Sequence, residues 1–112
     1  MSQITTHILD TTKGKPAANV PIALLRQMGD NWQEIARGIT NLDGRITDLL
    51  PKSMQLELGV YKMKFFTQEY FAHDGTANFY PFVEIVFSVA STEHYHIPLL
   101  LNPFGYATYR GS

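Results

Sequence analysis

The sequence has no cysteine in its 112 residues, and this absence excludes several classes of protein. Without thiols the chain can form no disulfide scaffold, no thiol nucleophile and no cysteine-ligated zinc site. Basic blocks are also missing and the net charge is −1, so binding of nucleic acid through its phosphates is not expected. The longest apolar runs are much shorter than a membrane span requires, so no membrane partner is expected either.

Length and composition predict a single domain that spans residues 1–112. Hydrophobic residues make up 45% of the chain, which is enough to build a core. The first residues include no basic segment followed by a long apolar stretch, so no secretory signal is recognised. We therefore expect a cytoplasmic location, or a periplasmic one if a signal peptide has been removed.

Short β-rich runs separated by turn residues dominate the chain. Asp43-Gly44 is a strong turn signal, and residues 68–73 are the only segment that reads as a helix. The predicted strands cover residues 3–9, 20–28, 32–40, 45–50, 60–67, 82–90, 94–101 and 105–109. Eight short strands at this spacing are typical of an all-β sandwich or barrel, and no long helical periodicity supports an α/β fold.

Three consecutive leucines, Leu99 to Leu101, mark an unusually apolar segment near the end of the chain. Successive side chains on a strand point to opposite faces, so at least one of the three must point away from the core. An outward apolar side chain is most easily covered by another subunit. The segment of residues 95–106 therefore predicts a subunit interface.

Four basic side chains are candidates for chemistry: His7, Arg45, His94 and His96. The simpler alternative for each is structural, because isolated histidines are most often surface or interface residues and a charge at a strand edge prevents aggregation. His94 and His96 share one face of a strand, which suits two ligands of one metal ion with His7 as a third. No carboxylate or cysteine completes that set at a recognised spacing, so the metal site is the weaker interpretation. His73 lies in a predicted turn and is assigned to solvent.

The tail of the chain, Tyr109 to Ser112, is a further candidate. Chain ends usually fray and carry no structure. Here an aromatic and apolar run, residues 104–109, leads into the tail, and this composition predicts an ordered end. The hydroxyl and carboxylate of Ser112 would then lie close to a strand.

These motifs resemble those of the 5-hydroxyisourate hydrolase family, the transthyretin-like enzymes of urate breakdown. The resemblance covers the whole chain, and the matching segments are Thr6–Asp10, Gly14–Ala17, Asp43–Ile46, His94–Leu101, Gly105–Tyr106 and Thr108–Ser112. The terminal Tyr-Arg-Gly-Ser is the most specific of them. It separates the hydrolases from the transthyretin hormone carriers, which share the fold and lack this tail.

The resemblance implies an all-β fold, a transthyretin-like two-sheet antiparallel β-sandwich of eight strands with one short helix. It also implies a homotetramer, a dimer of dimers, with active sites in a central channel at the dimer–dimer interface. The functional residues of the family fall on His7, Arg45, His96 and Tyr109–Ser112. His94 is a weaker correspondence, because family members vary at this position.

The reaction that the resemblance implies is hydrolysis of 5-hydroxyisourate, in purine catabolism, to 2-oxo-4-hydroxy-4-carboxy-5-ureidoimidazoline. Water attacks a ring amide carbonyl, a neutral histidine takes its proton, and a guanidinium stabilises the developing oxyanion. No metal and no organic cofactor is expected. The expected catalytic residues are His7, Arg45, His96 and Ser112, and the expected substrate-binding residues are His7, Arg45, Tyr109, Arg110 and Gly111.

Two alternatives remain at this point. The first is a transthyretin-like carrier that binds small aromatic ligands in its channel and catalyses nothing; His7, His96 and the tail together argue against it. The second is the metal-dependent protein described above. The sequence leaves open which histidine is the general base and what role His94 has.

Overall fold

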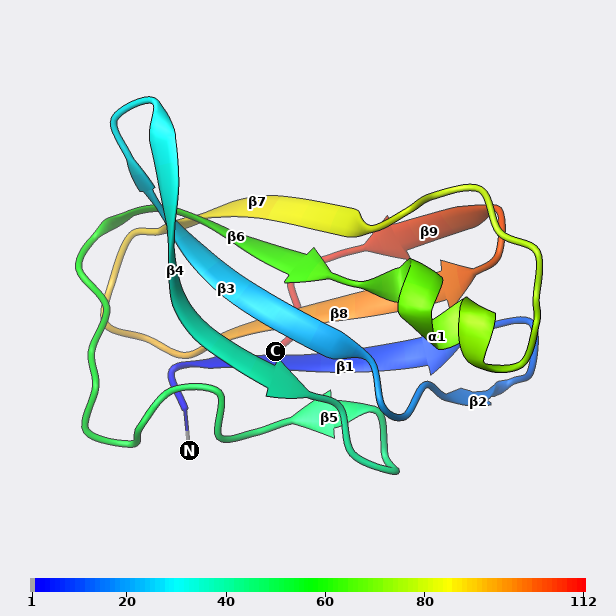
Figure 1. Cartoon of the computed structure of the whole chain (residues 1–112). Coiled ribbons are helices and arrows are strands. Elements are labelled where there is room, and N and C mark those ends of the chain that lie inside the picture. Colours follow the sequence, from blue (N-terminus) through cyan, green and yellow to red (C-terminus); the bar gives the residue numbers. More distant parts are fainter. Residues whose placement is uncertain (1) are drawn as a thin grey trace.

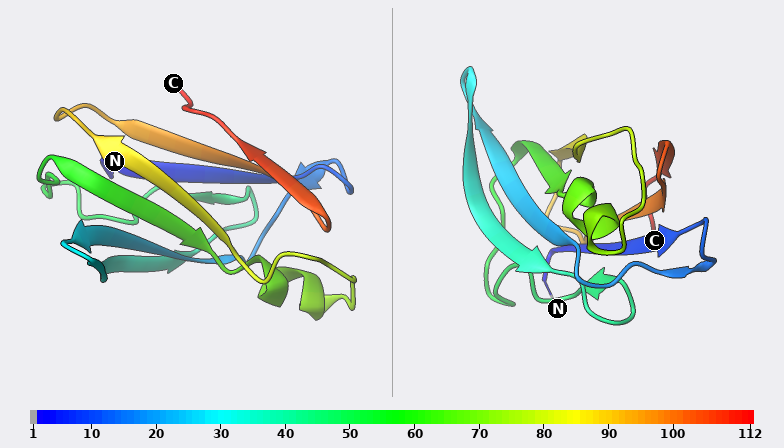
Figure 2. Two further views of the ribbon diagram at one scale, coloured as in Figure 1. Left: turned by 90° about the horizontal axis from the view of Figure 1, so that it is seen from above. Right: turned by 45° about the vertical axis from the view of Figure 1, so that its right-hand side comes forward.

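The structure, a computed structural model, describes residues 2–112 of the chain. These residues form two sheets that pack face to face as a sandwich (Figure 1), and Figure 2 shows the sheets as separate layers. Nine strands and one helix lie within the described range: β1 (Ile4–Asp10), β2 (Lys15–Pro16), β3 (Pro21–Met28), β4 (Asn31–Ile39), β5 (Arg45–Ile46), β6 (Gly59–Phe65), α1 (Thr67–His73), β7 (Val83–Val89), β8 (Tyr95–Asn102) and β9 (Gly105–Thr108).

One sheet has the order β2-β1-β8-β9, with β5 also paired to β1, and the other has the order β4-β3-β6-β7. The predicted two-sheet sandwich with one short helix is confirmed. One pairing departs from the antiparallel expectation: β1 and β8 run parallel, as both arrows show in Figure 1. A parallel pair needs a long connection, and here most of the chain lies between the two strands.

Most strands begin and end within two residues of their predicted bounds, and two segments differ more. The predicted strand of residues 45–50 ends at Ile46, because Leu49 and Leu50 are both buried and so cannot alternate between two faces. The chain there leaves the sheet and is held by Ser2, whose hydroxyl accepts a hydrogen bond from the Leu50 amide at 3.0 Å. The predicted loop of residues 11–18 contains the additional two-residue strand β2, which pairs with the end of β1.

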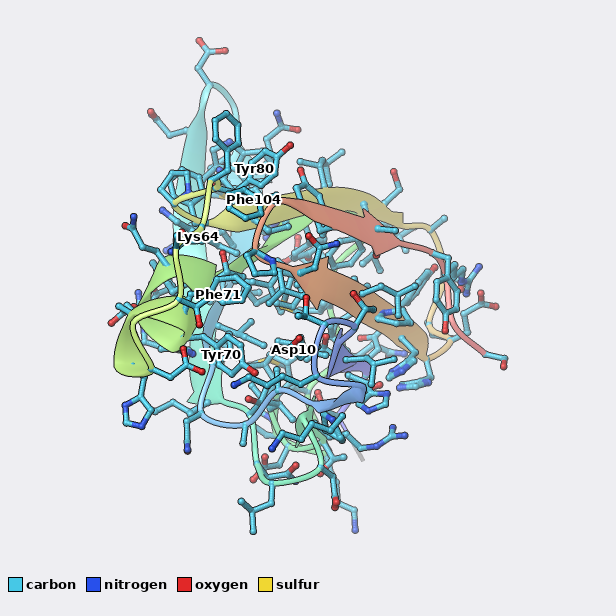
Figure 3. The ribbon with its side chains drawn as sticks, turned by 90° about the vertical axis from the view of Figure 1, so that its right-hand side faces the viewer. Asp10, Lys64, Tyr70, Phe71, Tyr80 and Phe104 are labelled. Atoms are coloured by element: carbon cyan, nitrogen blue, oxygen red, sulfur yellow. The ribbon has the colours of Figure 1, made fainter. Side chains whose placement is uncertain are left out.

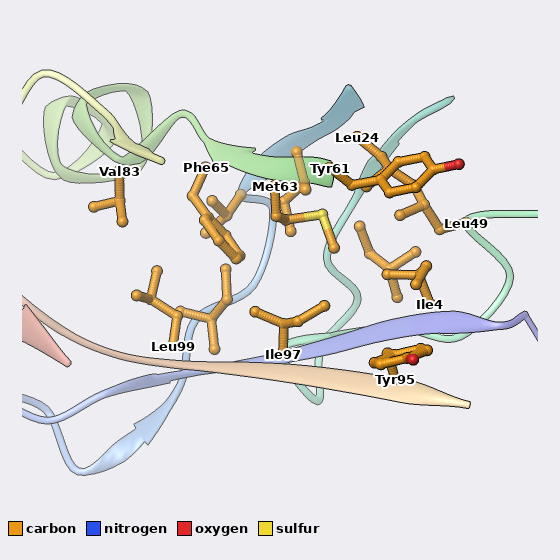
Figure 4. Close-up of a cluster of buried hydrophobic side chains, with 14 of the residues drawn as sticks. Ile4, Leu24, Leu49, Tyr61, Met63, Phe65, Val83, Tyr95, Ile97 and Leu99 are labelled. Carbon is orange, nitrogen blue, oxygen red and sulfur yellow. The ribbon is translucent and has the colours of Figure 1, made fainter. Parts of the chain in front are cut away.

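The core lies between the two sheets and follows the alternation of each strand. Met63 and Phe65 point inward from β6, and Ile97 and Leu99 meet them from β8 (Figure 4). Leu101 is also buried, whereas Leu100 between them faces the opposite side and is only half-buried. The prediction that one of the three leucines points away from the core is therefore confirmed.

The helix α1 closes one end of the sandwich and is tied to β1 by a buried carboxylate. Asp10 is 1% exposed, and its Oδ2 accepts a hydrogen bond of 2.7 Å from the Tyr70 hydroxyl (Figure 3). Burial and this carboxylate raise the pKa of Tyr70, so the phenol stays protonated and keeps donating. This hydrogen bond joins the helix to the end of β1, the strand on which the site is built.

Within residues 2–112 no helix has the length and apolar character needed to cross a bilayer.

Candidate functional site

The central strand β1 gathers the candidate residues on the outer face of its sheet. His7 lies opposite Arg45 of β5, and Thr5 lies opposite His96 of β8. Inward side chains such as Ile4 and Ile8 fill the core, so alternation directs Thr5 and His7 to the outer face. Residues that lie about 40 and 90 positions apart in the sequence thus become neighbours through one shared strand, as expected for cross-strand pairs.

The turn before β5 places Arg45 beside His7. The side-chain oxygen of Asn41 accepts hydrogen bonds from the amides of Asp43 and Arg45, at 2.9 and 3.0 Å. Gly44 has a φ of +71°, and a Cβ at this position would lie 2.5 Å from the carbonyl oxygen of Ile8. The turn can therefore dock against β1 only with glycine at position 44, which explains the Asp-Gly pair ahead of the arginine.

The tail passes directly against His96. The amide of Gly111 donates a 2.9 Å hydrogen bond to the backbone oxygen of His96, which forms an isolated bridge to β8. A Cβ at position 111 would lie 2.5 Å from Cδ2 of the imidazole and 3.2 Å from Cγ of Pro98. Only a glycine lets the tail backbone approach the ring this closely. In Figure 2 the C-terminus lies on the outer side of the sheet formed by β1, β8 and β9.

A threonine that the sequence analysis did not single out connects the two histidines of the His-x-His pair. The hydroxyl of Thr5 lies 2.8 Å from Nε2 of His94 and 2.8 Å from Nδ1 of His96. The two rings are stacked, with centroids 6.3 Å apart. His94 thus joins the cluster through Thr5, and the sequence carried no signal for this link beyond a threonine on a β-like segment.

The clustered side chains border a hollow of about 180 Å³ on the outer face. Its lining residues are Thr5, Thr6, Arg45, Thr47, His94, His96 and Ser112. Arg45, His96 and Ser112, three of the predicted catalytic residues, therefore share one hollow. The fourth, His7, lies on β1 opposite Arg45 of β5, and the charge of the guanidinium lowers its pKa.

His7 and His96, two of the three histidines of the cluster, are biased toward the neutral form. Burial lowers the pKa of His7, and the charge of Arg45 lowers it further, against a smaller opposite effect from Asp43. Burial also lowers the pKa of His96, with additional lowering from Arg45, His94 and His7. At pH 7 both imidazoles are therefore neutral and can accept a proton.

The first prediction concerns these titrations. We expect the NMR titration midpoints of His7 and His96 to lie below 6.5, their ordinary value. The substitution Arg45→Gln should raise both midpoints, because a nearby positive charge disfavours the imidazolium. Arg26→Gln, which removes a positive charge from β3 in the other sheet, is the control and should leave them unchanged. Equal midpoints in the Arg45→Gln variant and the wild type would contradict the assigned cause.

Two residues predicted to bind substrate, Tyr109 and Arg110, line a second hollow, which shares only His96 with the first. Arg110 forms an ion pair with Glu93, and its guanidinium lies 4.5 Å from the centre of the Tyr95 ring. Tyr109 is 58% exposed and borders this second hollow between His96 and Phe87 of β7. Gly111 and Ser112 therefore lie at the first hollow, with the histidines and Arg45. Tyr109 and Arg110 lie at the neighbouring edge of the sandwich, in the second hollow.

The candidate metal ligands His7, His94 and His96 are not gathered as a set of three. Among the residues that the structure describes, no group of three or more His, Asp or Glu side chains is placed to hold a metal ion. His94 and His96 instead share the hydroxyl of Thr5.

Comparison with known proteins gives one consistent family. Residues 4–111 match the HIUase/Transthyretin family. A mouse protein named 5-hydroxyisourate hydrolase is 45% identical over 114 residues, which cover 99% of this chain and 96% of that protein. The solved 5-hydroxyisourate hydrolase of Klebsiella pneumoniae is 35% identical and has a TM-score of 0.86, covering 97% of this chain and 98% of that one. Sea bream transthyretin, solved with thyroxine, is 34% identical with a TM-score of 0.90, covering 98% and 95%.

Proposed function

The chain belongs to the HIUase/transthyretin family, and we propose that it is a hydrolase that opens the ring of 5-hydroxyisourate without a metal ion. The product is 2-oxo-4-hydroxy-4-carboxy-5-ureidoimidazoline. The observation that carries the proposal is the cluster of Arg45, His7 and His96, with the tail packed on His96. A site with two neutral histidines and a fixed cation suits hydrolysis better than simple binding of a ligand.

The cluster supplies the groups that water attack on an amide carbonyl requires. A neutral imidazole takes a proton from water while a C–O bond forms at the carbonyl carbon. Negative charge then develops on the carbonyl oxygen, and the planar guanidinium of Arg45 stabilises it. When the ring C–N bond breaks, the imidazolium returns the proton to the leaving nitrogen. The balance is one water added and one carboxylic acid formed.

Substrate contacts in this proposal extend along the tail. Gly111 lets the chain pass over His96, and Ser112 borders the same hollow as Arg45. In this proposal Tyr109 and Arg110 contact the substrate from the edge of the sandwich, where they line a hollow together with His96. The sea bream neighbour, which binds thyroxine, supports a carrier of small aromatic ligands as the second candidate.

We propose further that the enzyme is a homotetramer with active sites between facing copies. Ligand pockets usually measure about 300–1,000 Å³, so a hollow of about 180 Å³ is small for a complete site. A second copy facing this sheet would enclose it and would cover Leu9 and Leu100, a half-buried apolar pair on the same face. The edge strands β7 and β9 lie along the same side of the sandwich (Figure 1), which suits edge-to-edge pairing in a dimer.

An absorbance assay separates the hydrolase from the carrier. Freshly generated 5-hydroxyisourate decays slowly without a catalyst, and we expect micromolar enzyme to accelerate its loss with saturation kinetics. Treatment with a chelator should leave the rate unchanged. Binding of an aromatic ligand with no acceleration of the decay would favour the carrier, and loss of rate on chelation with recovery on adding zinc would favour the metal-dependent alternative.

The second prediction concerns assembly. Light scattering at micromolar concentration is expected to give a mass four times that of the 12.7 kDa chain. Leu100→Glu places a charge on the proposed interface and should lower the oligomeric state and the turnover together. Leu42→Glu, at a position that is 86% exposed, is the matched control and should change neither. A wild-type monomer with full activity would contradict both the interface and the shared site.

A further inference from the structure

The hydroxyl of Thr5 couples the protonation states of two imidazoles. It lies 2.8 Å from Nε2 of His94 and 2.8 Å from Nδ1 of His96, and the residue is only 4% exposed. A hydroxyl has a single proton to donate and lone pairs to accept with. Two neutral rings could both donate to the hydroxyl, but its own proton would then be unpaired, because the described residues offer this buried group no other acceptor. The hydroxyl proton is paired only if one ring donates to Thr5 and the other accepts from it. The tautomer of one histidine therefore fixes that of the other.

Two arrangements satisfy this condition, and they differ in what His96 can do. If Thr5 donates to Nδ1 of His96, the proton of this ring is on Nε2, which then has no lone pair for a water. If His96 donates from Nδ1, Thr5 donates onward to Nε2 of His94, and Nε2 of His96 remains free to accept a proton. Gly111 covers the Cδ2 edge of the His96 ring and Thr5 engages Nδ1, so Nε2 is the nitrogen left for the hollow.

We propose that Thr5 and His94 are positioning residues that hold His96 in the second arrangement, which makes Nε2 of His96 the general base. The inference rests on the proposed hydrolase and names its base. His94 serves as the terminal acceptor of the relay. When His96 takes the proton of water, both of its nitrogens carry protons and Nδ1 still donates to Thr5. The catalytic proton transfer therefore needs no rearrangement of the relay, in line with a preorganised site.

The tautomers of His94 and His96 can be determined by NMR in the absence of substrate. Long-range proton–nitrogen NMR of the histidine-labelled enzyme at about pH 8 should show the His96 proton on Nδ1 and the His94 proton also on Nδ1. Thr5→Val keeps the shape of the side chain and removes the hydroxyl, and it should move the His96 proton to Nε2, the preferred site in a free histidine side chain. Thr5→Ser retains the hydroxyl and should keep the wild-type tautomers. His94→Phe removes the acceptor and should act as Thr5→Val does.

Kinetics then test whether the relay matters for turnover. Thr5→Val should lower kcat about 10-fold or more with little change in KM, which is part of the ~10²–10⁴ that a general base contributes. Thr5→Ser should restore kcat to near the wild-type value. The double variant Thr5→Val/His94→Phe should lose no more than Thr5→Val alone, because both substitutions break one relay.

Thr40→Val is the matched control for the loss of a buried hydroxyl. Thr40 is 2% exposed, and like Thr5 its hydroxyl makes two hydrogen bonds, here with the backbone of Ala17 and Val20. This variant should melt at a lower temperature and keep the wild-type tautomers and kcat. An unchanged His96 tautomer in Thr5→Val would overturn the inference, and so would an altered tautomer with unchanged kcat. If the wild type fails to accelerate substrate decay, the proposed function is wrong, whereas the NMR result still decides whether the relay exists.

Discussion

Replacing Arg45 by alanine is expected to lower kcat/KM for 5-hydroxyisourate by about 10²- to 10³-fold, the usual cost of losing a group that stabilises an oxyanion. The effect should fall mainly on kcat, because the charge on the carbonyl oxygen develops in the transition state. The fold should survive, since the Arg45 side chain is exposed and the pairing of β5 with β1 uses backbone atoms. Single-turnover absorbance measurements and a thermal melt would check both parts.

Two further variants separate the shape of the guanidinium from its charge. Arg45→Lys keeps the charge and loses the planar pair of donors, so it should recover only a small part of the lost activity. Lys15→Ala also removes one positive charge from the same sheet, at an exposed position on β2, and should leave kcat/KM near the wild-type value. Near wild-type turnover in Arg45→Ala would remove this residue from the mechanism.

Most of the fold could be predicted because strands and turns have local sequence patterns. Alternating apolar residues and turn signals such as Asp43-Gly44 act over a few positions, so the sandwich and its short helix follow from the sequence. The early end of β5 depends instead on Ser2, which binds the segment after Ile46 from the other end of the chain. The parallel pairing of β1 with β8 joins segments about 90 residues apart, so no local sequence pattern could predict it.

The candidate site shows the same division. His7, Arg45, His96 and Ser112 were expected from a family resemblance, and the shared strand β1 is the physical reason that the first three lie together. Thr5 was missed because a threonine on a strand is ordinary, and its importance appears only once the register sets it opposite His96. Register across a parallel pair is fixed by tertiary packing, so residue type and spacing could not predict this contact.

The tail is expected to be as important for turnover as the histidines. Deleting residues 109–112 should abolish measurable hydrolysis, because the segment covers one edge of His96 and borders the hollow that contains Arg45. The melting temperature should change little. Tyr109 and Arg110 are exposed, and the tail contributes a single isolated bridge to the sheet. A deletion variant with wild-type turnover would show that the tail is only a frayed end.

A single methyl group provides the sharper version of this test. In Gly111→Ala the new Cβ would lie 2.5 Å from Cδ2 of His96, so either the ring or the tail must move. Displacements of about 1 Å in an active site can cost about 10²-fold in rate, and we expect a loss in kcat/KM of that order. Gly105→Ala, in the same C-terminal hairpin, is the control, because its Cβ would find its nearest neighbour at an ordinary 3.6 Å. Turnover should therefore fall in the first variant and persist in the second, whereas equal turnover in both would mean that the seating of the tail on His96 has no part in catalysis.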